Sequence, residues 1–178
     1  PAMMETVART VAINPSIDVA RRELAQQGIR LDKKTVRRIA VQFGEQLFAV
    51  RRRELAEFRE GNLPAGDKFA GLRIAVQIDG GRLRTRQNKL SGKKRKKGSR
   101  QKFDTPWREP KALVIFAFDE RGRMVSRHRQ PLIDGTLLGP DHTAELVAYH
   151  LHRLGAARAE RVVFIADGAR WIWDSIDW

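Results

Sequence analysis

Two aspartates, Asp79 and Asp167, each lie where a predicted strand ends. Aliphatic residues occupy every second position from Leu72 to Ile78, so Asp79 is expected on the face opposite them. Asp167 follows the apolar run Val162 to Ala166, a pattern typical of a buried strand. Clustered carboxylates can hold two divalent cations for phosphodiester chemistry, and hard oxygen ligands favour magnesium or manganese. Taken singly, each aspartate has the alternative of an ordinary turn residue at a strand end.

The elements around these acids are predicted from local pattern. A hairpin is expected from a buried strand over 112–118, a tight turn over 120–122 and a returning strand through Val125. A helix with one apolar face is expected to begin at Asp141 and to end at Gly155. The order after residue 68 is therefore three strands, a helix and a strand.

The N-terminal third is predicted to be helical. A short helix begins near Ser16 and is ended by Gly28, and Asp32 is a good N-cap for a second helix, with Gly44 as a break within it. Helix, short turn and helix resemble the DNA-binding helix-turn-helix. The residues that the second helix would present to DNA are Lys33, Lys34, Thr35, Arg37 and Arg38. The alternative is an ordinary helical hairpin with a solvated basic face.

The two stretches that contain the aspartates, "VQIDGGRLR" and "DGARWIW", resemble bacterial insertion-sequence transposases of the DDE class. The resemblance covers about Leu72 to Trp173 and implies a ribonuclease H-like fold, whose strand order would place Asp79 and Asp167 side by side. It makes these residues the first two acids of the catalytic triad and the ligands of Mg²⁺ or Mn²⁺, with two metals only in the complete protein. The third acid, a glutamate on a later helix, has no counterpart, so the chain is expected to be the N-terminal portion of a transposase and inactive alone.

These readings give a fold class and a division of the chain. The fold class is α+β or α/β, with a helix-turn-helix region followed by a partial ribonuclease H-like mixed sheet with a helix. The expected divisions are a DNA-binding region over 1–60, a linker over 61–68 and a partial catalytic domain over 69–178.

Charge supports a nucleic-acid partner. The 178 residues carry a formal net charge of +14, and eleven lysines and arginines with no acid lie between Arg82 and Lys102. Such a segment is expected to contact phosphates, and its alternative is a solvated loop that only aids solubility. The cations at its centre are Lys93, Lys94, Arg95, Lys96 and Lys97.

The cysteine and histidine content limits the kinds of catalytic and metal site that the chain can form. The absence of cysteine excludes disulfides and thiol nucleophiles. The four histidines have no metal-ligand spacing, and Trp171 and Trp173 are interpreted as core residues of the missing half of the catalytic domain, in preference to base-stacking ones. No apolar run approaches the length of a membrane span and no signal pattern is present, so a cytoplasmic protein without membrane contact is expected.

The expected function is a DNA transposase that binds transposon ends and, when complete, cuts and joins DNA strands. Assembly of the complete protein as a homo-oligomer is a further expectation. The alternatives are a truncated or domesticated DNA-binding module without catalysis, and a ribonuclease H-like nuclease.

Overall fold

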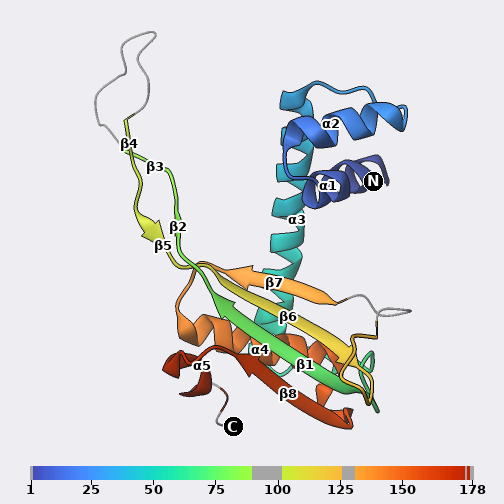
Figure 1. Ribbon diagram of the computed structural model, residues 1–178, viewed down its shortest axis with the longest axis vertical. Helices are drawn as coiled ribbons and strands as arrows, with labels where there is room; N and C mark the ends of the chain where they lie inside the picture. Colours follow the sequence, from blue (N-terminus) through green and yellow to red (C-terminus); the bar gives the residue numbers. More distant parts are fainter. Residues whose placement is uncertain (1, 90–101, 126–130, 175, 177–178) are drawn as a thin grey trace. The chain divides into compact units, whose positions relative to one another are not determined.

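The computed structural model describes residues 2–89, 102–125, 131–174 and 176. It has a mixed α and β architecture, in which three N-terminal helices precede a four-stranded mixed sheet with a helix. The chain divides into two units, residues 1–63 and 64–178. Figure 1 shows the helices of the first unit in blue and the sheet of the second in green to red.

The first unit consists of α1 (Ala2–Ile13), α2 (Ile17–Gln26) and α3 (Lys33–Arg59). Ser16 caps α2 by accepting from the Val19 amide at 3.2 Å, and Asp32 caps α3 by accepting from the Thr35 amide at 3.0 Å. Both predicted helix starts are therefore confirmed. The predicted break at Gly44 is wrong, because α3 runs through it without interruption. A single glycine costs a helix only about 1 kcal/mol, which the flanking helix formers offset.

A small apolar core joins these helices. Val7 of α1, Leu24 of α2, and Val36 and Ile39 of α3 are buried together. Helix α1 is thus an integral partner of α2 and α3, which had been expected to form a two-helix motif.

The second unit is built on a sheet with the strand order β7-β6-β1-β8. Strand β1 pairs antiparallel with β6, β6 pairs antiparallel with β7, and β1 pairs parallel with β8. Between β7 and β8 the chain forms α4, and a short α5 follows β8. The bounds are β1 (Arg73–Gly80), β6 (Lys111–Phe118), β7 (Leu132–Thr136), α4 (Pro140–Leu154), the 3-10 helix η1 (Ala156–Arg158), β8 (Arg161–Ala166) and α5 (Arg170–Asp174).

The predicted hairpin is confirmed in its first half and corrected in its second. The turn after β6 is closed by Asp119, which accepts from the amides of Arg121 and Arg123, both at 2.9 Å. The return is only an isolated bridge from Phe118 to Met124, and the full third strand is β7, further along the chain. Strand β7 contains an aspartate and a glycine, which obscure its strand pattern in the sequence.

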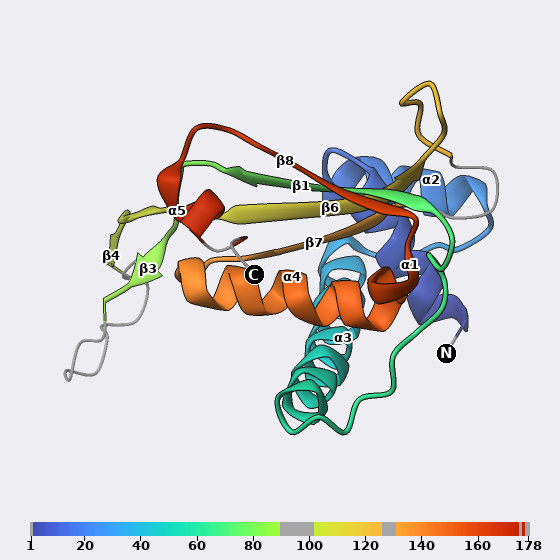
Figure 2. The same ribbon diagram turned by 90° about the horizontal axis from the view of Figure 1, so that it is seen from below.

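Helix α4 packs on one face of the sheet (Figure 2). The alternating residues Ile74, Val76 and Ile78 of β1 are buried on this side, together with Leu146 and Val147 of α4. Gly139 is the N-cap of α4, so Asp141 lies in its first turn instead of at the predicted capping position. Gly155 ends the helix in the left-handed conformation, as predicted.

The segment before β1 is tied to the end of α4. The Gly66 amide donates to the His152 carbonyl at 3.2 Å, and the Phe69 amide donates to the Leu154 carbonyl at 2.9 Å. These residues belong to the second unit, which begins at Pro64 within the stretch 61–68 that had been interpreted as a linker.

Beyond the sheet, the strands β1 and β6 continue as a two-stranded ribbon (Figure 1). Its paired segments are β2 (Leu83–Arg84) with β5 (Trp107–Arg108), and β3 (Gln87–Asn88) with β4 (Phe103–Asp104). Among the residues described, none of the helices combines the length and apolar character needed to cross a membrane.

Candidate functional site

Asp79 is the penultimate residue of β1 and is exposed. Its neighbours at alternate positions, Ile74, Val76 and Ile78, are buried beneath α4, so Asp79 lies on the opposite face of the sheet. The predicted orientation is confirmed, and it leaves the carboxylate accessible to a ligand.

Asp167 directly follows β8 and is also exposed. Its side chain accepts a hydrogen bond from the Ala169 amide at 3.0 Å, and its backbone carbonyl accepts from the Trp173 indole at 3.0 Å. These two bonds connect the strand end to α5 and hold the residue in a defined turn. One carboxylate oxygen, Oδ1, is used in this turn.

The sheet brings the two aspartates together across 88 residues of sequence. In the parallel ladder of β1 and β8, the last pair is Ile78 with Ala166. Asp79 follows Ile78 within β1, and Asp167 is the first residue after the end of β8. Neighbouring strands lie about 4.8 Å apart. The two residues therefore occupy equivalent positions at the carboxyl ends of adjacent strands, and the expected pairing of their strands is confirmed.

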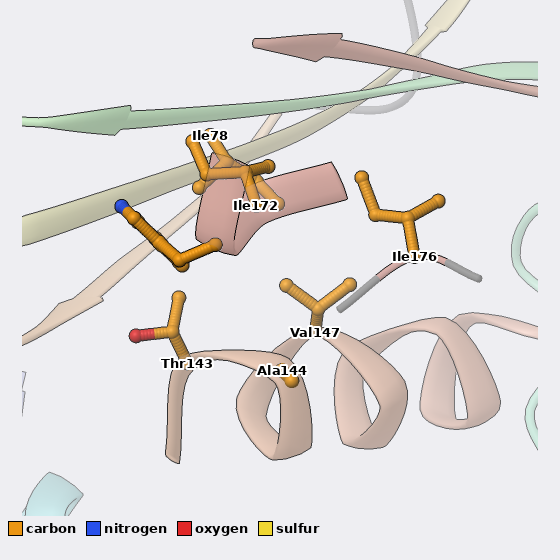
Figure 3. Close-up of a pocket in the computed structure, with 7 residues that line it drawn as sticks. Ile78, Thr143, Ala144, Val147, Ile172 and Ile176 are labelled. Atoms are coloured by element: carbon orange, nitrogen blue, oxygen red, sulfur yellow. The ribbon is translucent and has the colours of Figure 1, made fainter. Parts of the chain in front are cut away.

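The side chains that pack beneath the strand ends at Asp79 and Asp167 are apolar. Ile78 of β1, Val147 of α4 and Ile172 of α5 converge on a small pocket between the sheet and α4 (Figure 3). Ile172 is almost fully buried, although α5 has only five residues. Because Ile78 precedes Asp79 and Ile172 follows Asp167, this packing restrains both aspartates.

Lys111 is a residue of this edge that the sequence analysis missed. It pairs with Gly80, next to Asp79, and only 5% of it is exposed. Its ammonium lies 5.4 Å from the centre of the Trp171 ring and 3.5 Å from a carboxylate oxygen of Glu109. The sequence signal for Lys111 is a lysine at the start of an apolar strand. Such a lysine is buried only where it has partners, so its position could have indicated a polar site at this end of the strand. The contact gives Trp171 a role within this unit.

The donor set suits a hard divalent cation, because it consists of two carboxylates on one accessible edge. Within the described part of the chain, no group of three or more histidine, aspartate or glutamate side chains is arranged to hold a metal ion. The pair can thus supply two protein oxygen ligands, and water or phosphate oxygens would have to complete the coordination.

The basic residues predicted on the second helix fall into two groups. Lys34, Arg37 and Arg38 are exposed on α3. Lys33 donates to Asp18 of α2 at 2.5 Å, and the Thr35 hydroxyl donates to Asp32 at 2.6 Å. The first group is available to a ligand, whereas the second also serves the structure of the helical unit.

The contacts of Lys33 and Thr35 also lower the pKa values of the two aspartates that they bind. The hydrogen bond from Lys33 lowers the pKa of Asp18, and the hydrogen bonds from the Thr35 hydroxyl and amide lower the pKa of Asp32. Both carboxylates consequently stay ionised to a lower pH than a free aspartate, so these contacts at the starts of α2 and α3 persist further into the acid range.

The predicted phosphate-contacting residues Lys93 to Lys97 lie outside the described residues. His128 lies outside the described residues as well. His150 of α4 contacts Asp134 of β7 at 2.8 Å beneath the sheet, which couples the helix to an edge strand.

Comparison of the chain with protein-family models, with curated proteins and with solved structures finds no match.

Proposed function

We propose that this chain acts on DNA as a transposase of the DDE class, through a ribonuclease H-like sheet. The observation that carries the proposal is that Asp79 and Asp167 each directly follow the last ladder pair, Ile78 with Ala166, at the carboxyl ends of the adjacent parallel strands β1 and β8. The strand order β7-β6-β1-β8, in which only β1 and β8 are parallel, also supports the proposal. The resemblance to DDE transposases implies that the strands leading to the two acids are neighbours in the sheet.

In this proposal Asp79 and Asp167 hold a Mg²⁺ or Mn²⁺ ion. A bound divalent cation would stabilise charge on the oxygens of a phosphodiester during strand cleavage. The protein's own contribution is positional: the turn at Asp167 and the apolar contacts of Ile78 and Ile172 keep the two carboxylates at one edge. With two protein ligands and several waters, binding is expected to be weak, in the millimolar range of open carboxylate sites.

The metal site is tested by titrating Mn²⁺ into the full chain and following the paramagnetic broadening of amide resonances. Broadening should centre on residues 79 and 167, and Asp79→Asn or Asp167→Asn should each weaken binding at least several-fold. Asp141→Asn, which changes an exposed acid in the first turn of α4, is the matched control and should have no effect. Equal affinity in all four proteins would refute the site.

DNA binding is proposed for the exposed cations of α3. If this helix enters the major groove, Arg37→Ala or Arg38→Ala should relax sequence preference, since a bidentate base contact contributes about 1–3 kcal/mol of discrimination. Uniform weakening on all sequences would assign these residues to phosphates instead. Selection of preferred sites from a random duplex library, with each variant, separates the two outcomes.

A second candidate is a DNA-binding module without catalysis. It is favoured by one observation, that no cluster of three acidic or histidine ligands occurs among the described residues. Incubation with plasmid DNA and Mn²⁺ discriminates between the candidates. Nicking that is lost in Asp79→Asn supports catalysis, and tight DNA binding without metal-dependent nicking supports the module. Preferential cleavage of an RNA–DNA hybrid would instead indicate a ribonuclease H-like nuclease.

A further inference from the structure

The ribbon beyond the sheet, here called the β ribbon, consists of residues 81–89 and 102–110. Its strands keep the register of β1 and β6, and three backbone bonds of 3.0 Å close it along its length. The amides of Gly81, Thr85 and Lys89 donate to the carbonyls of Pro110, Pro106 and Lys102 respectively. The β ribbon is thus an ordered extension of the sheet.

One face of the β ribbon alternates arginines with aromatic rings. Arg84 is paired with Trp107, and since side chains on a strand alternate between faces, Arg86 and Phe103 lie on the same side. The guanidinium carbon of Arg84 lies 4.8 Å from the centre of the Trp107 ring, and that of Arg86 lies 4.0 Å from the centre of the Phe103 ring. These four residues are called the aromatic face.

The rings of the aromatic face are not core residues. Trp107 is 60% exposed and Phe103 is 46% exposed. A guanidinium covers part of each ring, and the exposed remainder offers a flat apolar surface beside a positive charge. Aromatic rings and arginine planes of this kind are the groups on which unpaired nucleic-acid bases stack.

The charge of the β ribbon matches such a ligand. Residues 82–89 and 102–109 contain six basic side chains and two acidic ones, a net charge of +4. The basic residues are Arg82, Arg84, Arg86, Lys89, Lys102 and Arg108, and the acidic residues are Asp104 and Glu109. Cations distributed along both strands can follow a phosphate backbone while the rings meet the bases.

We propose that the β ribbon binds single-stranded or unpaired DNA, with bases stacked on Trp107 and Phe103 and phosphates held by the neighbouring cations. The proposal deepens the DNA-binding part of the proposed function and rests on it only for the identity of the ligand as DNA. The proposal does not depend on the metal site proposed at Asp79 and Asp167. A ribbon that read the major groove of a duplex would need polar side chains directed at the base edges, whereas the guanidinium groups of Arg84 and Arg86 lie over the two rings.

The test compares three fluorescein-labelled DNAs of one sequence: a single strand of twelve nucleotides, a blunt duplex, and a duplex with an unpaired tail. The full chain is titrated into each, and fluorescence anisotropy gives the affinity. The double variant Trp107→Ala/Phe103→Ala should bind the single strand and the tail at least about tenfold more weakly, as expected for the loss of base–aromatic stacks. Its affinity for the blunt duplex should change little.

Two control variants make the test specific. Leu83→Ala removes an exposed apolar side chain from the opposite face of the same ribbon and should leave all affinities unchanged. Trp107→Phe keeps a ring and should retain most single-strand binding. A 2-aminopurine base in the single strand should be quenched on binding to the wild type and not on binding to the double variant. Circular dichroism melts check that every variant is folded.

Three outcomes would overturn the proposal. The first is wild-type affinity of the double variant for the single strand. The second is an equal loss on the blunt duplex, which would indicate groove binding. In both cases, duplex binding by the wild type that is weakened or made less selective by Arg37→Ala would leave the proposed function standing. The third is failure of the wild type to bind any of the three DNAs, which would overturn the DNA-binding function as well.

Discussion

At the scale of single residues, the contact of His150 with Asp134 is a buried polar link between α4 and the sheet. His150 is 4% exposed, and its Nε2 lies 2.8 Å from the Asp134 carboxylate. We expect His150→Ala to lower the free energy of unfolding by about 1–3 kcal/mol, because it leaves a largely buried carboxylate without this partner. Asp134→Asn, which keeps an acceptor oxygen, should cost less. Urea unfolding of both variants measures the difference, and equal losses would contradict the assigned role of the contact.

A second prediction at this scale concerns two glycines with opposite surroundings. A Cβ added at Gly66 would lie 1.9 Å from the Arg153 carbonyl oxygen, whereas one added at Gly44 has no atom within 4 Å. Gly66→Ala should therefore destabilise the protein by about 1–3 kcal/mol, as overpacking against backbone does. Gly44→Ala, inside α3, should stabilise it by about 0.5–1 kcal/mol. Thermal melts of the two variants should shift in opposite directions, and a shared direction would be inconsistent with this packing.

At the scale of elements, the start of α3 depends on an ionised Asp32. Its folded pKa lies below its ordinary value of 3.8, chiefly because the Thr35 hydroxyl and amide donate to the carboxylate. The folded state thus binds fewer protons than the unfolded state, so the stabilisation is present above pH 3.8 and is lost as the pH falls through the folded pKa.

Asp32→Asn tests this linkage, since asparagine also caps helices but does not titrate. We expect the helical signal of the wild type to melt at a lower temperature at pH 3 than at pH 6, and the variant to show a smaller decrease. Circular dichroism melts at the two pH values provide the comparison. An identical decrease would show that other acids, such as Asp18, dominate the acid response.

At the scale of the whole molecule, charge governs the proposed interaction with DNA. The net charge of +14 is concentrated between Arg82 and Lys102, while the rest of the chain carries 24 basic and 21 acidic residues. Binding to duplex DNA should therefore weaken with salt, by about 0.9 log units of affinity per log unit of salt for each phosphate neutralised.

Replacing Lys93, Lys94, Arg95, Lys96 and Lys97 with serine should flatten this dependence. The slope is measured by anisotropy titrations at several NaCl concentrations. Arg121→Ser, in the turn after β6, removes a single cation outside the basic segment and serves as the control. An unchanged slope in the five-residue variant would show that these residues make no phosphate contacts.

Much of the local structure could be predicted from the sequence. The alternation before Asp79, the strand before Asp167 and the caps at Ser16, Asp32 and Gly155 all depend on neighbours within a few residues. The predicted burial of that strand is wrong, because β8 is an edge strand whose Val162, Val163 and Ile165 are exposed. Periodicity and capping are properties of short segments, so the sequence carries them directly. The same reasoning failed for β7, where the position of Asp134 within a strand is explained by its contact with His150 of α4, a distant residue.

The sequence by itself thus determined the strands that carry Asp79 and Asp167, the face on which Asp79 lies, and the basic surface of α3. Only the tertiary structure decided that β1 and β8 are parallel neighbours, that Lys111 is buried beside the site, and that Arg84 lies over Trp107. The physical reason is separation along the chain. Contacts between residues 20 to 90 positions apart depend on the register and closure of the whole sheet, which no local pattern encodes.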